Sequence, residues 1–286
     1  MITITGATGQ LGRLVLADLL DRGVPAADLT AAVRSPEKAA DLAAQGIRVV
    51  EADYDRPETL GPALAGTDRL LLISGSEPGR RIPQHQNVVD AARAAGVGLI
   101  VYTSAPKAAT SSLRLAAEHK ATEEAIAASD LPSVILRNGW YLENYTGTLA
   151  QTLEHGVVLG SAGDGRVSAA TRADLAAAAA AVLVDPAPVA GTIYELGGDE
   201  AFTMSELAAE ISRQSGTPVV YRDLPEAEYA QTLVGFGVPA PFAEVLADSD
   251  RGLSVGDLFI DSGDLRRLIG RPPTSLADAV TAALKA

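Results

Sequence analysis

A glycine-rich turn between an apolar strand and an amphipathic helix restricts the fold of this chain more than any other feature. Residues 5–12 read T-G-A-T-G-Q-L-G and follow a short apolar run at residues 2–5. Apolar residues then recur at helical spacing, at Leu11, Leu14, Val15 and Leu19. Such a turn exposes backbone N–H groups, and the positive end of the helix points at the same place. The pattern therefore predicts a phosphate-bearing nucleotide ligand.

The three glycines of the turn have different expected tasks. Gly6 allows the tight turn, Gly9 lets the backbone approach a pyrophosphate, and Gly12 lets the helix pack closely on the strand. Their spacing is G-x-x-G-x-x-G, which differs from the G-x-G-x-x-G dinucleotide fingerprint. An ordinary glycine turn is the alternative, and the flanking strand and helix favour the nucleotide site.

Apolar segments alternate with helical ones through the first half of the chain. The expected strands are residues 2–5, 29–33, 48–51, 69–73, 99–102 and 133–136. This order is typical of an α/β fold with a doubly wound parallel sheet of the Rossmann type, in which ligands bind at the carboxyl ends of the strands. We therefore expect a nucleotide-binding domain over residues 1–138.

The regular alternation of strands and helices becomes less clear after residue 139. The expected elements are a helix at 140–154, a glycine-rich passage at 156–165, an alanine-rich helix at 174–184, a strand at 192–196, a helix at 206–215, a strand at 219–221 and an interrupted helical region at 226–247. We expect residues 139–286 to form mostly the substrate cleft and a smaller C-terminal cap. Segments near 166–198 should return to the sheet.

Composition excludes several classes of protein. A net charge of −13 disfavours nucleic acid and anionic membrane surfaces as partners, because neither attracts an acidic protein. The absence of cysteine removes disulfides and thiolate nucleophiles, and the three scattered histidines do not suggest a metal site. No apolar run approaches the roughly 18 residues needed to cross a membrane. We expect a cytoplasmic protein without membrane insertion.

The second expected strand ends in Arg34, where an Asp or Glu would bind the ribose hydroxyls of NAD. A guanidinium can instead bind the 2′-phosphate of NADP in a bidentate manner, and Lys38 follows one helical turn later. Glu37 is an alternative ribose ligand, and both cations could equally be solvated surface charges. The pattern favours NADP over NAD.

Small or polar residues follow two further strands. Asp53, after the third strand, could accept from the adenine amine or simply stabilise a turn. Ser74, Gly75 and Ser76, after the fourth strand, permit close approach of the central riboses, although a plain loop is the alternative.

The sixth strand is followed by a dense group of polar and aromatic residues. Asn138 and Gly139 should lie beside a nicotinamide, and Tyr141 and Asn144 could line a flat pocket. Trp140, the single tryptophan, could serve the site or only pack in the cap. The later stretch at residues 169–174 resembles a return to the cleft, with helix capping by its aspartate as the simpler role.

The chain lacks the tyrosine–lysine pair with which many short-chain dehydrogenases relay a proton. None of its seven tyrosines has a lysine four residues later. Lys120 lies near the start of an expected helix and could be a substrate-side cation, although a surface role is favoured slightly.

Together these segments resemble the NmrA-like atypical short-chain dehydrogenases, and within them the bacterial type 2 NAD(P)H:quinone oxidoreductases. The resemblance covers nearly the whole chain and is carried by residues 4–12, 71–76, 83–85, 136–145, 162–165, 171–174, 247–250 and 268–272. It implies NADPH as cofactor, no flavin, and quinones as acceptors. The cofactor-binding residues that it implies are Gly6, Ala7, Thr8, Gly9, Gln10, Leu11, Arg34, Ser74, Gly75, Ser76, Asn138, Gly139, Trp140, Tyr141, Leu142, Glu143, Ala170, Thr171, Arg172, Ala173 and Asp174.

The missing proton relay suits a quinone better than a ketone. Hydride addition to a ketone leaves an alkoxide whose conjugate acid resembles water, with a pKa of about 16, so an acid must be supplied. A quinone leaves a phenolate-like anion with a conjugate-acid pKa of about 10. Our hypothesis is direct hydride transfer in a cleft bounded by Tyr102, Tyr141 and Asn144, with Asn144 on a quinone oxygen.

Two other interpretations stay open at the level of sequence. An NADP(H)-binding redox sensor that reports the cofactor ratio needs no catalytic acid. An isoflavone-reductase-like enzyme would need a catalytic lysine near Lys120. Assembly as a homodimer is also left open.

Overall fold

The computed structural model describes residues 1–285 and divides the chain into two compact units. The first unit consists of Met1–Ala105, Ala117–Asn138 and Arg172–Tyr194, and the second of Pro106–Ala116, Gly139–Thr171 and the residues from Glu195 onward. One break follows Asn138, where we placed the domain boundary from sequence. The assignment of residues 106–116 to the second unit was not expected.

A seven-stranded sheet forms the centre of the first unit. Its order is β3-β2-β1-β4-β5-β6-β8, and the pairs from β3 to β6 are parallel. The strands are β1 (Ile2–Thr5), β2 (Leu29–Val33), β3 (Arg48–Glu51), β4 (Arg69–Leu72), β5 (Leu99–Ser104), β6 (Ser133–Asn138) and β8 (Thr192–Leu196). The α/β fold expected from sequence is confirmed. The strand order reverses at β1 and β4, and ligands of such sheets bind beside that point, past the carboxyl ends of the strands.

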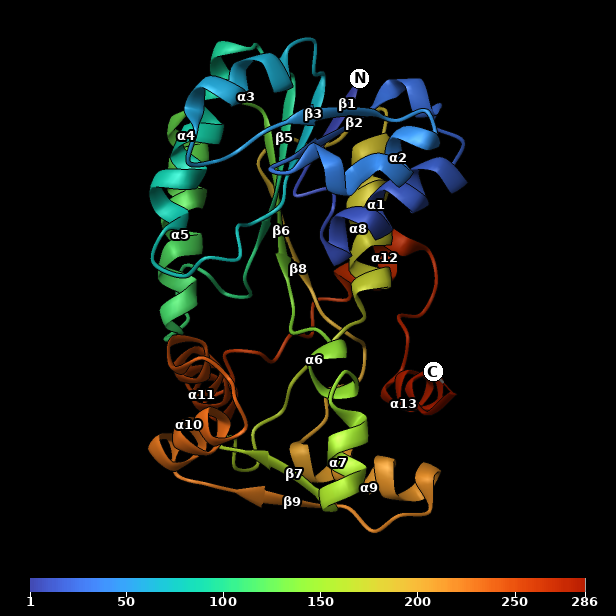
Figure 1. Cartoon of the computed structure of the whole chain (residues 1–286), viewed down its shortest axis with the longest axis vertical. Coiled ribbons are helices and arrows are strands. Elements are labelled where there is room, and N and C mark those ends of the chain that lie inside the picture. Colours follow the sequence, from blue (N-terminus) through green and yellow to red (C-terminus); the bar gives the residue numbers. More distant parts are fainter. Residues whose placement is uncertain (286) are drawn as a thin grey trace. The chain divides into compact units, whose positions relative to one another are not determined.

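Helices cover both faces of this sheet (Figure 1). One face carries α3 (Pro57–Leu64), α4 (Arg81–Ala94) and α5 (Arg114–Ala128), and the other carries α1 (Gln10–Asp21), α2 (Ala40–Ala44) and α8 (Arg172–Val184). Because both faces are covered, all five residues of β2 are buried. The alanines of α8 allow it to pack closely on α1, and Arg22 Nη2 donates to the carbonyl of Ala177 at 3.2 Å.

The second unit is mostly helical around a small parallel ladder of β7 (Val157–Gly160) and β9 (Val220–Asp223). Its helices are α6 (Glu143–Thr146), α7 (Leu149–His155), α9 (Met204–Ser215), α10 (Glu226–Gly235), α11 (Ala240–Ser254), α12 (Asp264–Ile269) and α13 (Leu276–Lys285). Leu142, Phe202, Ile211 and Val280 are among the apolar side chains of its core. The unit therefore has a hydrophobic core of its own.

Some of the expected elements differ from the structure for local reasons. The expected helix at 140–154 is divided into α6 and α7, because Thr148 leaves the helical region with φ −110° and ψ 14°. The strand β7 was missed, since its glycine-rich surroundings disguise a run of four residues. The helical region 226–247 is divided before α11, where Gly237 has φ +87°.

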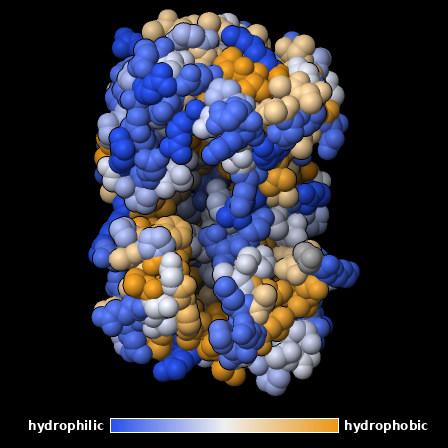
Figure 2. Space-filling model, viewed as in Figure 1, coloured by the Kyte–Doolittle hydropathy of each residue, from blue (hydrophilic) through white to orange (hydrophobic). Residues whose placement is uncertain are grey.

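Exposed apolar side chains gather on α10 and α11, where Figure 2 shows hydrophobic surface. Val234, Phe236 and Phe242 retain 45%, 63% and 52% of their surface. Within residues 1–285, no helix combines the length and apolarity that a membrane span requires. The same residues contain no histidine and carboxylate group suited to a metal ion.

Candidate functional site

The glycine turn joins β1 to α1 and leaves the helix start open. Gly6 has φ +60°, a conformation that side chains disfavour, and its carbonyl accepts the N–H of Gly9 at 2.9 Å. Gly6, Gly9 and Gln10 are exposed, and α1 has no acidic residue in its first turn. The partial positive charge of this 12-residue helix is therefore available to an anion.

The back of the turn is closely packed. Ala7 is fully buried and Leu11 retains 7% exposure, so these side chains support the turn from inside. A Cβ at Gly12 would lie 2.5 Å from the carbonyl oxygen of Gly6 and 2.7 Å from the Cα of Ala7. Glycine at position 12 is thus required by the backbone of the turn itself.

The loop after β4 is anchored by side chains from β5, from α4 and from the loop after β3. The N–H of Ser74 donates to Thr103 Oγ1 at 2.9 Å, and the N–H of Gly75 donates to His85 Nε2 at 3.0 Å. The hydroxyl of Tyr54 donates to the carbonyl of Ile73 at 3.0 Å. These bonds fix the loop in which Ser74, Gly75 and Ser76 were predicted to meet a ligand.

His85 is held neutral by its position. The ring is fully buried, and burial lowers its pKa from 6.5 to about 4. Because Nε2 accepts from Gly75, the proton of the neutral ring lies on Nδ1, which faces Thr122 Oγ1 at 2.8 Å. Arg81 supports the same loop by donating Nε to the carbonyl of Gly75 at 2.5 Å. The sequence pattern did not predict this role for His85, because its partner Gly75 lies ten residues away in a loop whose course only the fold defines.

Arg34 lies at the end of β2, as predicted, with 65% of its side chain exposed. Its Nη1 is 2.8 Å from Glu77 Oε1, a partner that sequence spacing did not indicate. Glu37 and Lys38 are both exposed. Asp53 has the turn role that was its alternative, because its Oδ1 accepts the N–H of Asp55 at 3.0 Å.

The polar side chains at the ends of β5 and β6 differ in whether a hydrogen-bonding atom is left for a ligand. Tyr102 has no exposed surface, its hydroxyl is 2.7 Å from His119 Nδ1, and burial raises its pKa above the usual range. This packing argues against direct contact between Tyr102 and an acceptor. Asn138 is also buried, but its Oδ1 has no hydrogen-bond partner within residues 1–285. A buried acceptor of this kind calls for a donor from a ligand.

Within the second unit, two predicted segments lie side by side. The N–H of Ala170 donates to the carbonyl of Trp140 at 2.9 Å, and the N–H of Leu142 donates to the carbonyl of Ala170 at 3.0 Å. Trp140 packs partly against the core of this unit, which is the packing role considered from sequence. Tyr141 and Asn144 lie on this segment, both partly exposed, with the N–H of Asn144 bonded to the carbonyl of Tyr141 at 3.0 Å.

The remaining predicted residues are divided between the units. Gly139, Glu143 and Thr171 belong to the second unit, whereas Arg172, Ala173 and Asp174 begin α8 in the first. Glu143 and Thr171 are partly exposed, and Asp174 is fully buried.

Lys120 is half exposed and faces Glu124 at 3.9 Å, so the structure gives it a surface role.

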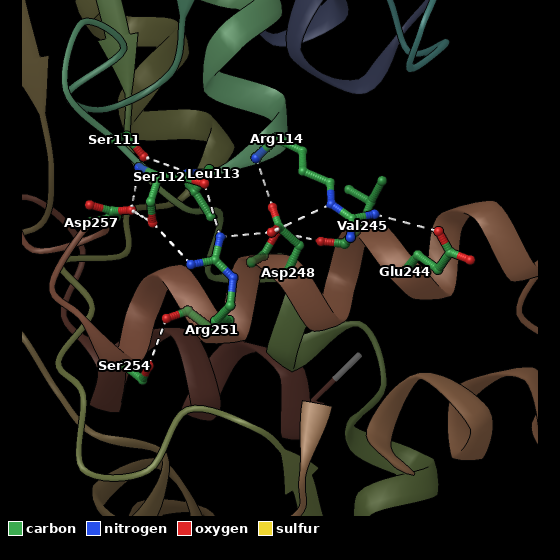
Figure 3. Close-up of polar contacts among 11 residues, drawn as sticks. Ser111, Ser112, Leu113, Arg114, Glu244, Val245, Asp248, Arg251, Ser254 and Asp257 are labelled. Atoms are coloured by element: carbon green, nitrogen blue, oxygen red, sulfur yellow. Dashed lines mark hydrogen bonds and ion pairs between the residues drawn. The ribbon is translucent and has the colours of Figure 1, made fainter. Parts of the chain in front are cut away.

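A polar network in the second unit is structural (Figure 3). Asp248 of α11 accepts the N–H of Arg114 at 2.8 Å and pairs with Arg251 at 2.8 Å. Asp257 accepts both the N–H and the hydroxyl of Ser112, at 2.8 and 2.7 Å. These carboxylates satisfy backbone donors at the start of α5, which otherwise lack partners.

A model of an NAD(P)H-binding family matches residues 6–186, more than half of the chain. The chain belongs to this NAD(P)H-binding family. The part of the chain that matches the family model begins at the glycine turn and extends through α8. The open start of α1, the glycines behind it and the unpartnered Oδ1 of Asn138 are all features that fit a dinucleotide of this family.

Individual proteins are similar to this chain over nearly its whole length. Quinone oxidoreductase 2 of Escherichia coli is 53% identical over 281 residues, which cover 98% of this chain and 98% of that protein. The crystal structure of the NADPH-dependent quinone oxidoreductase QOR2 of E. coli, complexed with NADPH, matches with a TM-score of 0.96 and 52% identity over 99% of this chain and 100% of that one. The Citrobacter sp. triphenylmethane reductase, complexed with NADP(H), matches with a TM-score of 0.95 and 42% identity over 99% of this chain and 100% of that one.

Proposed function

We propose that this protein is an NADPH-dependent quinone oxidoreductase that delivers hydride to its acceptor without a flavin. The observation that carries the proposal is 53% identity to the E. coli quinone oxidoreductase over 98% of both chains. The glycine turn and the end of β2 are consistent with it, since both present what a phosphorylated dinucleotide requires.

The first unit would hold the cofactor through four features. The exposed start of α1 receives the pyrophosphate, and Arg34 receives the 2′-phosphate after turning from Glu77. The loop at Ser74–Ser76 lies against the riboses, and Asn138 Oδ1 accepts from the carboxamide. When bound, NADPH supplies the hydride.

The second unit would supply acceptor contacts from Tyr141 and Asn144, which lie together on the segment after Gly139. We leave Tyr102 out of this set because it is fully buried. The remaining predicted cofactor residues, Trp140 to Glu143 and Ala170 to Asp174, stay proposals that a bound structure would test.

Turnover tests the proposal directly. Purified protein mixed with NADPH and a simple para-quinone should consume the nicotinamide absorbance over many turnovers, and NADH should serve less well. Tight NADPH binding without turnover would refute the enzyme and favour the redox-sensor alternative. Loss of turnover in Lys120→Ala would instead favour the lysine-dependent reductase.

Arg34 is tested by its effect on cofactor preference. Arg34→Ala should weaken NADPH binding by about 10-fold to 150-fold, since hydrogen bonds to charged groups contribute roughly 1.5–3 kcal/mol, and should leave NADH binding nearly unchanged. Arg222→Ala, at an exposed arginine of the second unit, is the matched control. Equal losses for both cofactors would remove Arg34 as the phosphate ligand.

The likeness to triphenylmethane reductase suggests a second acceptor class. A triphenylmethane dye cation becomes neutral when its central carbon accepts hydride, so it needs no proton donor. Bleaching of such a dye by NADPH and this protein would show that the acceptor site admits both classes.

Cytoplasmic location and a homodimer stay proposals. Cell fractionation tests the first and light scattering tests the second.

A further inference from the structure

A group of three polar side chains in the first unit joins the ends of two neighbouring strands to one helix. We call it the strand-end clamp, and its members are Ser104 of β5, Glu123 of α5 and Arg137 of β6. All three belong to the first unit, as does Asn138, the last residue of β6. None of the three is among the cofactor-binding residues that the resemblance implies.

The carboxylate of Glu123 is the centre of the clamp. Its Oε1 accepts from the Ser104 hydroxyl at 2.6 Å and from Arg137 Nε at 2.9 Å, and its Oε2 accepts from Arg137 Nη2 at 2.7 Å. The guanidinium therefore meets the carboxylate through two N–H···O bonds, which fix the orientation of both groups. The side chains of Glu123 and Arg137 each retain 12% of their surface, so solvent screens this ion pair little.

The clamp lies at the carboxyl end of the ladder between β5 and β6. The register of these two strands ends with Ser104 opposite Arg137. Ile135, two residues before Arg137, packs in one core cluster with Ile126 of α5, so this face of β6 is the one that α5 covers. Glu123 thus holds the final pair of the ladder from the side of α5, at a place where strand ends tend to fray.

Asn138 directly follows Arg137 and offers an independent sign of a ligand. Successive side chains of a strand point to opposite faces, so the amide of Asn138 lies on the face of β6 away from α5. The residue is 7% exposed, and its Oδ1 has no hydrogen-bond partner within residues 1–285. A buried acceptor of this kind is costly unless a ligand donates to it. The direction of this amide depends on the backbone that the clamp holds one residue earlier.

We propose that the strand-end clamp positions Asn138 for the nicotinamide carboxamide, with Glu123 as a positioning residue that acts through the backbone of β6. This inference rests on the cofactor part of the proposed function, in which Asn138 Oδ1 accepts from that carboxamide. The effect of the clamp is confined to the nicotinamide half of the cofactor. The start of α1 and Arg34, which receive the phosphates, follow β1 and β2 rather than β5 and β6.

A cofactor fragment separates positioning from a general loss of structure. The fragment 2′-phospho-ADP-ribose contains the adenine, the 2′-phosphate and the pyrophosphate of NADPH but lacks the nicotinamide. Glu123→Gln keeps an oxygen for the Ser104 hydroxyl but loses the charge that holds Arg137, so the end of β6 should loosen. Calorimetry should show NADPH bound about 2-fold to 12-fold more weakly, the range that one neutral hydrogen bond contributes, and the fragment bound as before.

The neighbouring glutamate of α5 supplies the matched control. Glu124 is exposed and faces Lys120 at 3.9 Å, so Glu124→Gln should change the affinity of neither NADPH nor the fragment. Equal losses of both ligands in Glu123→Gln, or no loss of either, would overturn the inference.

A double-mutant cycle tests whether Glu123 acts through Asn138. Asn138→Ala should weaken NADPH within the same range and leave the fragment unaffected. Adding Glu123→Gln to this variant should cause no further loss, because the amide that the clamp positions is already gone. Additive losses would show that Glu123 acts by another route and would overturn the inference.

Ser104→Ala is a milder variant, which matters because removing one partner of a buried ion pair can prevent folding. It removes one hydrogen bond to Glu123 and leaves the pair with Arg137 intact. NADPH, but not the fragment, should bind at least about 2-fold more weakly. Unchanged NADPH affinity in this variant would make the clamp a purely structural ion pair and overturn the inference.

These binding measurements do not depend on an acceptor. A protein that gives the expected affinities but reduces no quinone would refute the acceptor part of the proposed function and leave this inference standing. Unaltered protein that binds NADPH no more tightly than the fragment would show that Asn138 contributes nothing to the nicotinamide end, and would refute the inference.

Discussion

Gly12 lies where the first turn of α1 touches the turn that precedes it, so replacing it by alanine tests the architecture of the nucleotide site. The added Cβ would lie 2.5 Å from the carbonyl oxygen of Gly6 and 2.7 Å from the Cα of Ala7. Non-bonded heavy atoms prefer separations of about 3.5–4.0 Å, so the turn must move by roughly 1 Å. Both contacted atoms belong to the backbone, which cannot rotate out of the way as a side chain would.

Overpacking of this size costs about 1–3 kcal/mol. If the altered turn must recover its shape to bind the pyrophosphate, the same cost weakens NADPH by about 5-fold to 150-fold, because 1.4 kcal/mol corresponds to a factor of ten. If the free protein carries the strain instead, its free energy of unfolding falls by that amount. Gly12→Ala should therefore lose cofactor affinity, stability or both.

The assay is a fluorescence titration with NADPH beside urea unfolding of the cofactor-free protein. Gly235→Ala is the matched control, since Gly235 ends α10 and a Cβ there meets nothing within 4 Å. That control should keep both its NADPH affinity and its stability. Unchanged affinity and stability in Gly12→Ala would refute the packing argument.

The contacts of Glu77, Gly160 and His85 each predict a measurable effect. Glu77→Gln should tighten NADPH binding by up to about 5-fold without affecting NADH, because the half-exposed pair with Arg34 contributes about 1 kcal/mol at most; calorimetry with both cofactors checks this. Gly160→Ala should lower the free energy of unfolding by about 1–3 kcal/mol but leave NADPH affinity unchanged, since its Cβ would lie 2.7 Å from Asp250 Oδ2. Gly235→Ala, with open space around it, should change neither, and urea unfolding with NADPH titration measures both. As the pH drops from about 6.5 to 4, the unaltered protein should lose more stability than His85→Gln, because the unfolded chain binds a proton that buried His85, with a pKa of about 4, resists. Urea unfolding of both proteins across that range measures the difference. Equal pH dependence of stability in the two proteins would contradict the last of these.

The sheet could be predicted from sequence because each strand is a local pattern. Apolar runs such as Ile2–Thr5 and Leu29–Val33 are buried on both faces, and the glycine turn is recognisable from the residues beside it. Arg34 was placed by its distance from that turn alone. Its partner Glu77 is 43 residues away and belongs to a loop whose course only the folded sheet defines.

The bond from the N–H of Ser161 to Asp250 Oδ2 could not be predicted for the same reason. Ser161 and Asp250 are 89 residues apart, and the strand that aligns them, β7, has too few residues and too many neighbouring glycines to be recognised. Tyr102 shows the opposite error. Its place at a strand end suggested an open cleft, but His119 from α5 packs over its hydroxyl. A strand pattern identifies an end, and tertiary packing decides whether that end is accessible.

The separation of α1 and α8 along the chain has a consequence for biosynthesis. The two helices pack together, and the bond from Arg22 to Ala177 joins residues 155 positions apart. A ribosome adds about 5–20 residues per second, so the side of α1 that packs against α8 waits roughly 8–30 s for that partner. During that interval the nascent chain exposes part of α1, which chaperones can bind. Any translation product that stops before α8 leaves this side of α1 exposed to other proteins.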